Sequence, residues 1–267
     1  MKRKKPLLGS LSSQFFAFIQ LKNKDIIRTG EIAPALGISR DQERMLLFRL
    51  ADSGWIVRLK RGVYLTPPKI PAGGNYGPGA ALILQRLMAV EEGYYQICGP
   101  TAFQFHGFTD QIPTITYAYN DRISGRRTIG GLQFQFIKVA SHRLGGTQNV
   151  KLQEGSHVVY SSRIRTLMDT IYDWSRFHSL PQGYQWVRTE VESIPKRSSE
   201  LIGCVTQYGN QATVRRVGYL LSALGVSRRS VNRLKGALNE SKALIPWVPN
   251  KPAKGTVNRE WGVIVNG

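Results

Sequence analysis

Residues 29–66 restrict the fold of this 267-residue chain more than any other stretch. Thr29 is placed to cap a short helix, Gly37 can supply a turn with positive φ, and Ser39 can begin a second helix. A short helix, a tight turn and a second helix in this order are typical of a helix-turn-helix. The sequence therefore predicts this motif, braced by an earlier helix over residues 12–21.

The predicted second helix begins with the capping-box sequence Ser39-Arg40-Asp41-Gln42 and ends at Gly54. Its apolar stripe, Leu46, Leu47 and Leu50, is expected to face the core. The polar side chains beside this stripe are candidates for reading bases in the major groove, because Arg pairs with guanine and Gln with adenine. They are Arg40, Gln42, Arg44 and Arg49, with Ser39 at the helix start. The alternative is an ordinary solvated helix face.

A β-hairpin with a cationic tip follows the second helix directly. Residues 55–59 and 63–66 have the composition of two strands, and Lys60-Arg61-Gly62 forms the turn between them. A hairpin in this position is a wing, whose cations meet phosphates or the adjacent minor groove. The expected wing contacts are Arg58, Lys60 and Arg61. The whole pattern predicts a winged helix-turn-helix that binds double-stranded DNA.

The distribution of charge agrees with a polyanionic partner. The net charge is +20; residues 1–70 hold 14 Lys and Arg against 5 Asp and Glu, and residues 201–267 hold 10 against 2. A basic field at both ends attracts nucleic acid and speeds encounter with it. The opening cluster, residues 1–6, is either a DNA-tracking arm or a solubilising terminus.

A proline- and glycine-rich segment over residues 67–79 marks the predicted domain boundary. We expect an α+β protein, with a winged helix-turn-helix domain at residues 1–70, a linker at 71–79 and a larger mixed α/β domain at 80–267. The larger domain is expected to contain helical segments at 80–90 and 163–191 and strands at 112–119, 132–139 and 158–160.

A basic pair of helices and a terminal strand are predicted to close the chain, after a polar connection at residues 193–199. Thr213 can cap a helix that ends at Gly225, and Ser227 can cap a second helix that runs to about residue 239. The cations of this pair predict a second surface for a polyanion, with a solvated helix face as the alternative. They are Arg215, Arg216, Arg228, Arg229, Arg233 and Lys235.

The sequence contains no pattern that indicates a catalytic centre, a metal site or a cofactor. Cys98 and Cys204 are far apart and have no clustered His, so neither zinc binding nor a disulfide framework is indicated. Without a signal peptide or an apolar run long enough to span a bilayer, the expected location is the cytoplasm.

Paired carboxylates occur once in the predicted helical region. Asp169 and Asp173 share one helix face and could serve metal or acid–base chemistry, but Arg165 and Arg176 favour ion pairs on the helix surface. The sequence therefore predicts a non-enzymatic protein.

Several short motifs, taken in order, resemble the AbiEi family of antitoxins over nearly the whole chain. They lie at residues 59–64, 99–102, 106–109, 165–169 and 255–266, whereas the Arg-rich stretch at 122–127 departs from the common pattern. The resemblance implies an N-terminal domain that represses its own type IV toxin-antitoxin operon by binding promoter repeats. It also implies a C-terminal domain that counters a nucleotidyltransferase-like toxin without forming a stable complex.

Two other functions compete with an antitoxin. One is a plain winged-helix repressor whose C-terminal domain senses a ligand or a partner. The other is a DNA-acting enzyme that docks through the winged helix, which would need a carboxylate cluster that the sequence does not offer.

Overall fold

The computed structural model describes residues 9–71, 73–151, 157–239 and 243–266, so the basic cluster at residues 1–6 lies outside the described residues. Contacts divide the chain into two compact units. The first unit comprises Met1–Tyr94 and Ser124–Gln135, and the second comprises Tyr95–Ile123 and Phe136–Gly267. The division falls after the proline- and glycine-rich segment, whose described residues contain no helix or strand.

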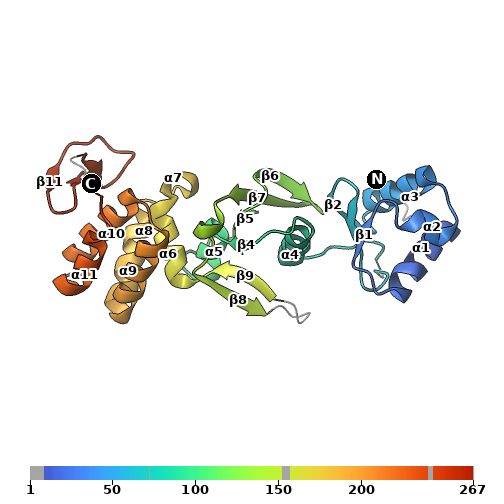
Figure 1. The fold of residues 1–267 in the computed structure, drawn as a ribbon, viewed down its shortest axis with the longest axis horizontal. Helices are drawn as coiled ribbons and strands as arrows, with labels where there is room; N and C mark the ends of the chain where they lie inside the picture. The colour runs from blue at the N-terminus through green and yellow to red at the C-terminus, as the bar shows by residue number, and fades with distance from the viewer. Residues whose placement is uncertain (1–8, 72, 152–156, 240–242, 267) are drawn as a thin grey trace. The chain divides into compact units, whose positions relative to one another are not determined.

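The first unit contains a winged helix (Figure 1). In chain order its elements are α1 (Ser10–Leu21), β1 (Ile26–Arg28), α2 (Ile32–Leu36), α3 (Arg40–Asp52), β2 (Val57–Lys60), β3 (Val63–Leu65) and α4 (Ala80–Val90). The three strands form an antiparallel sheet in the order β1-β3-β2. The predicted helix-turn-helix, α2 and α3, and the predicted wing, β2 and β3, are therefore confirmed. β1 was not predicted, because three residues are too few to show an alternating pattern.

Apolar side chains from the helices and the wing form the core of this unit. Phe15 and Phe16 of α1 pack edge to face with ring centroids 5.3 Å apart. The predicted stripe of α3, Leu46, Leu47 and Leu50, is buried in the same cluster. Each such side chain contributes about 1.5–3 kcal/mol when fully buried. This burial fixes which face of α3 remains outside.

The two helices of the motif are capped in different ways. The predicted capping box of α3 is confirmed: the Gln42 N–H donates to Ser39 Oγ at 3.1 Å, and the Ser39 N–H donates to Gln42 Oε1 at 2.8 Å. The prediction that Thr29 caps α2 is wrong, because its hydroxyl lies against the carbonyl oxygen of Gly62 in the wing, 3.5 Å away. The buried carboxylate of Glu43 caps α2 instead.

The second unit combines strands with a layer of helices. It begins with β4 (Tyr95–Ile97), α5 (Gly99–Phe105) and β5 (Ile115–Asn120), and continues after β7 (Leu132–Lys138) with a 3-10 turn at Ser141–Arg143, β8 (Thr147–Lys151) and β9 (His157–Ser161). The sheet has the order β6-β7-β5-β4-β9-β8, in which β6 (Gly125–Ile129) and the first residues of β7 cluster with the first unit. β4 pairs parallel with β9 and antiparallel with β5. Since the unit contains both helices and strands, the predicted mixed α and β structure is confirmed.

The helices that follow supply most residues of one core cluster in the second unit. They are α6 (Arg163–Tyr172), α7 (Trp174–Phe177), α8 (Gln182–Ser193), α9 (Lys196–Tyr208), α10 (Gln211–Ala223) and α11 (Arg228–Lys235). The predicted helical region over 163–191 is broken at His178, whose φ is +51°. The predicted polar connection at 193–199 is wrong, because α9 starts at Lys196 directly after Pro195, where a missing N–H is tolerated.

The C-terminal end carries the predicted strand. β12 (Val263–Val265) lies between β10 (Ile245–Pro246) and β11 (Thr256–Asn258). Asn210, not Thr213, caps α10: its side-chain oxygen accepts the Thr213 N–H at 2.8 Å. The predicted Ser227 cap of α11 is confirmed.

Arg165 and Asp169 form an ion pair inside the second unit. Arg165 Nε donates to the two carboxylate oxygens at 3.0 and 3.1 Å, and both side chains are 0% exposed. The expectation of pairing is met, but its predicted location on the helix surface is wrong. Asp173 accepts a hydrogen bond from Tyr119 at 2.6 Å and lies 3.7 Å from Arg176. Burial raises the pKa of Asp169 to about 6, although the neighbouring Arg165 opposes this shift.

Candidate nucleic-acid interface

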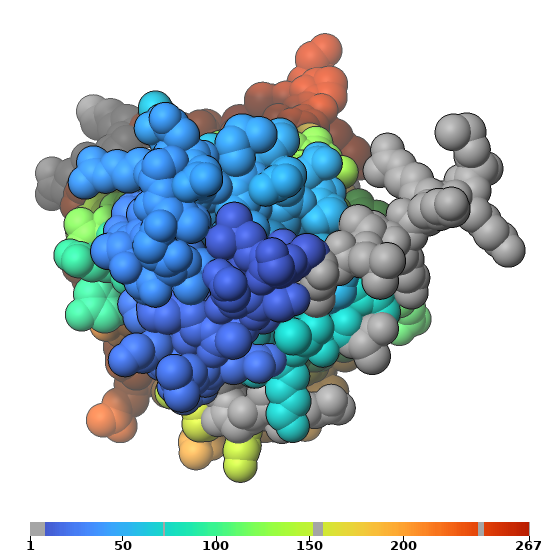
Figure 2. Space-filling model, turned by 90° about the vertical axis from the view of Figure 1, so that its right-hand side faces the viewer, coloured from blue at the N-terminus to red at the C-terminus, as the bar shows by residue number. Residues whose placement is uncertain are grey.

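A groove runs between the recognition helix α3 and the wing. In Figure 2 the residues of α1 to α3 and of the wing are drawn in shades of blue. The groove is lined by Thr29, Gly30, Arg40, Arg44, Met45, Phe48, Arg58, Arg61, Gly62 and Tyr64. It therefore brings together residues of the helix and of the hairpin that the sequence assigned to one DNA-binding surface.

The helical repeat explains which residues of α3 reach the groove. Arg40, Arg44 and Phe48 follow one another at intervals of four, so they lie on one side of the helix. The other side carries the buried residues Leu46 and Leu50. Burial of one side thus presents the other side, with two guanidinium groups, beside the wing.

The cations of the groove are largely uncompensated. Arg40, Arg58 and Arg61 form no ion pair within the part of the chain that the structure describes. Arg44 lies 2.8 Å from Asp41, but the two side chains are 65% and 86% exposed, and exposed pairs of this kind contribute only about 0–1 kcal/mol. Such guanidinium groups can bind phosphate oxygens or guanine edges with little competition from the protein.

Several predicted DNA contacts have another role or another place. Ser39 and the Gln42 carbonyl oxygen are engaged in the capping box, so Gln42 in this conformation cannot form the paired contact to adenine. Arg49 does not line the groove, and its Nε donates to the Met45 carbonyl oxygen at 3.3 Å. Lys60 lies 3.2 Å from Glu91 and is tied to the C-terminal end of α4. Among the residues that the structure describes, the wing cations without an ion pair are therefore Arg58 and Arg61.

Two apolar residues of the groove were missed by the sequence analysis. Met45 and Phe48 are 56% and 59% exposed, although both are large and hydrophobic. The signal was available, because Leu46, Leu47 and Leu50 already complete the buried stripe of α3. Exposed apolar side chains on a recognition helix can contact the C5-methyl group of thymine.

The second predicted polyanion surface is only partly present. Arg215 and Arg216 are 7% and 5% exposed, and their guanidinium groups donate to the carbonyl oxygens of Ala243 at 2.5 Å and Pro246 at 3.1 Å. Their assignment to an exposed surface is therefore wrong. Lys235 is paired with Glu260 at 2.6 Å. The remaining members of the predicted set, Arg228, Arg229 and Arg233, are exposed on α11.

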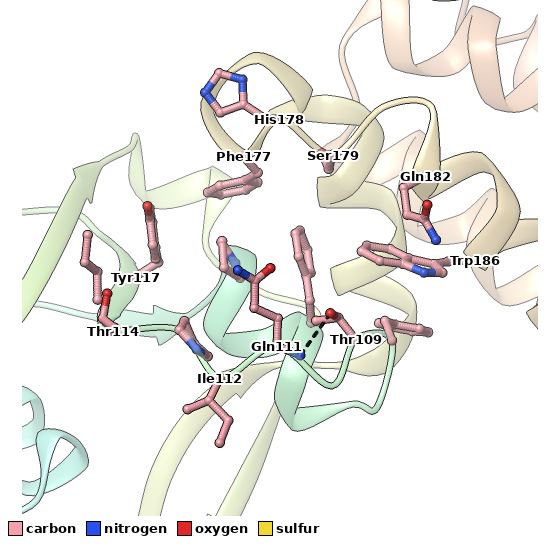
Figure 3. A pocket seen from close by; sticks show the side chains of 15 residues that line it. Thr109, Gln111, Ile112, Thr114, Tyr117, Phe177, His178, Ser179, Gln182 and Trp186 are labelled. Atoms are coloured by element: carbon pink, nitrogen blue, oxygen red, sulfur yellow. Dashed lines mark hydrogen bonds between the residues drawn. The ribbon is translucent and has the colours of Figure 1, made fainter.

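An uncharged pocket lies within the second unit (Figure 3). Its volume is about 480 Å³, and among its lining residues are Phe103, Phe108, Tyr117, Phe177 and Trp186, with no Asp, Glu, Lys or Arg. The rings of Phe108 and Trp186 stack with centroids 5.7 Å apart. Figure 3 shows the side chains of Gln111, His178 and Gln182 around the opening. Aromatic walls with a few neutral polar groups suit an uncharged ring compound.

The described residues reveal no grouping of three or more His, Cys, Asp or Glu side chains that could hold a metal ion. In the same portion of the chain, we find no helix with the length and apolar character required to cross a membrane. Cys98 and Cys204 are both free thiols, and Cys98 is buried.

Comparisons with known proteins bear on both units. No curated protein matches the chain. The crystal structure of the RV2827C protein from Mycobacterium tuberculosis is similar with a TM-score of 0.61 and 13% sequence identity, over 98% of this chain and 92% of that one, which extends a shared fold to both units. A family described as "Transcriptional regulator, AbiEi antitoxin" matches residues 17–67. The winged helix of this chain is therefore a match to the AbiEi antitoxin transcriptional regulators, as the sequence motifs predicted.

Proposed function

We propose that this protein is a DNA-binding antitoxin that represses transcription of its own operon in the cytoplasm. The observation that carries the proposal is the groove between α3 and the wing, with Arg40, Arg58 and Arg61 free of ion pairs within the described residues. The match of residues 17–67 to AbiEi antitoxin regulators supports the same role. The protein acts by binding and not by catalysis.

The groove residues are proposed to have two roles, base contacts from α3 and phosphate contacts from the wing. α3 enters the major groove, where Arg40 and Arg44 bind guanine edges and Met45 and Phe48 contact thymine methyl groups. Arg58 and Arg61 of the wing bind phosphates, which fixes the register of the helix without selecting a sequence. The operator is therefore expected to contain both guanine and thymine.

The second unit is proposed to oppose a toxin that resembles a nucleotidyltransferase, as part of a type IV system. The two proteins need not form a stable complex in such a system. Growth of cells that express the neighbouring gene, with and without this protein, tests this part. Growth arrest that the intact protein relieves is expected; an adjacent gene without toxicity would contradict it.

Fluorescence anisotropy tests the DNA-binding part directly. The purified protein is titrated with its own upstream duplex, a scrambled duplex and single-stranded RNA at several salt concentrations. Preference for the upstream duplex at physiological salt is expected, and a Lys69→Ala control, which removes an exposed cation outside the groove, is expected to bind like the parent. Equal and steeply salt-sensitive binding to all three would mean that the charge attracts polyanions without reading sequence.

A second candidate function rests on the uncharged aromatic pocket. A repressor whose second unit senses a small ring compound would use this pocket, which lies in a unit separate from the winged helix. Thermal unfolding with a panel of nucleosides and indole derivatives distinguishes the two functions. A compound that raises the melting temperature and changes operator affinity favours the sensor; no shift with any compound favours the antitoxin.

A further inference from the structure

The β6–β7 hairpin joins the winged helix although it comes about sixty residues later in the sequence. Its residues 124–135 belong to the first unit by contact. At the hairpin tip, Gly130 has a φ of +59°, and a Cβ there would lie 3.2 Å from Val57 in β2 and 3.3 Å from Ile83 in α4. The absence of a side chain at Gly130 therefore lets the tip sit against the wing strand.

A second groove separates the hairpin from the wing. It is lined by Ala51, Gly54, Ile56, Val57, Arg58, Asn75, Tyr76, Thr128, Gly130 and Gly131. Arg58 also lines the groove between α3 and the wing. The two grooves therefore meet at Arg58, and a duplex held by the wing would pass close to the hairpin.

The face of β6 that carries Thr128, a lining residue of this groove, also carries one exposed cation. Arg126 and Thr128 are two residues apart on β6, so they share one face of the strand, whereas Ile129 is buried on the other. The Arg126 guanidinium donates to the neutral Gln133 side chain. Residues 124–135 contain no Asp or Glu. Arg126 is thus exposed without a carboxylate partner among the described residues.

We propose that the β6–β7 hairpin binds the sugar–phosphate backbone of the same duplex, with Arg126 as its main contact. This inference rests on the proposed function, since it needs a duplex in the first groove. It extends the DNA-binding surface beyond the winged helix, to a segment outside residues 17–67 that match the family. The contact adds affinity and fixes orientation, because phosphates carry no sequence information.

The test compares Arg126→Ala with Lys138→Ala in the full-length protein. Lys138 is an exposed cation on β7 outside residues 124–135, so its removal matches the loss of charge. Arg126→Ala is expected to weaken binding to operator and scrambled duplexes alike, by about twofold to fivefold, and to lower the salt slope by about one. Lys138→Ala is expected to change neither. Hydroxyl-radical footprints of the Arg126 variant are expected to lose protection at one end.

The possible outcomes separate this inference from the proposed function. If the parent protein prefers its operator and Arg126→Ala binds with unchanged affinity, slope and footprint, the hairpin contact is wrong and the winged-helix function stands. An equal loss of DNA affinity with Lys138→Ala would show that the effect depends on net charge alone. That result would also contradict the proposed contact. If the parent protein shows no preference for duplex DNA, both proposals fail.

Discussion

Glu43 of the recognition helix holds Ile32 at the start of the preceding helix: its Oε1 accepts the Ile32 N–H at 2.8 Å, and its Oε2 accepts the Gly30 N–H at the same distance. The carboxylate is fully buried and also lies near the positive end of the α2 dipole. One side chain of α3 therefore binds two backbone N–H groups at the start of α2.

Replacing Glu43 with Ala is expected to destabilise the winged helix by about 1–3 kcal/mol, because two N–H groups lose their acceptor in the protein. Urea unfolding followed by circular dichroism measures the change. Asp52→Ala, which removes an exposed carboxylate at the other end of α3, is the control and is expected to stay within about 0.5 kcal/mol. Equal stability of Glu43→Ala and the parent would contradict the capping role.

Arg40 and Arg61 are expected to affect DNA binding differently. Arg40→Ala should lower operator affinity by about 1–3 kcal/mol with little loss on scrambled DNA, since it removes a base contact. Arg61→Ala should weaken all duplexes and reduce the salt slope by about one, since it removes a phosphate contact. Anisotropy titrations on both duplexes measure this. Equal losses for Arg40→Ala on the two duplexes would refute its base-reading role.

Phe48 is expected to contact a thymine methyl group. Replacing the operator thymines with uracil, one at a time, removes only that methyl group, and one position should lower parent affinity by about 0.8 kcal/mol, the value of a buried methylene. The Phe48→Ala variant should not distinguish the two bases at that position. A methyl effect of the same size in the parent and the variant would exclude Phe48 as the contact.

Asp169 is expected to make stability depend on pH. Its pKa rises from 3.8 to about 6 on folding, so between these values the folded state binds more protons than the unfolded state. Stability contributed by this group is therefore present at low pH and is lost as pH rises through about 6. The unfolding free energy of the parent minus that of Asp169→Asn should decrease from pH 4 to pH 7. An increase would mean that Arg165 outweighs burial.

The winged helix could be predicted because its signals are local. The Ser39 capping box spans four residues, and the α3 stripe repeats within two turns. The features that were missed depend on partners distant in the sequence: Glu43 reaches back 11 residues to Ile32, and the buried Arg215 binds a carbonyl group 28 residues later. Pattern analysis expects Arg at the surface and compares only residues close in sequence, so it cannot identify such a distant partner. The groove residues Met45 and Phe48 were missed for the opposite reason, since hydrophobic residues are expected inside.

The capping role of Gln42 limits how this protein can acquire a new operator. Its side-chain oxygen accepts the Ser39 N–H at the start of the recognition helix, so a substitution there that introduces a base contact also weakens the helix by about 0.5–1.5 kcal/mol. Arg40, Met45 and Phe48 have no such duty within the described structure. Divergence between related regulators should therefore concentrate at these three positions, where specificity and folding can vary independently.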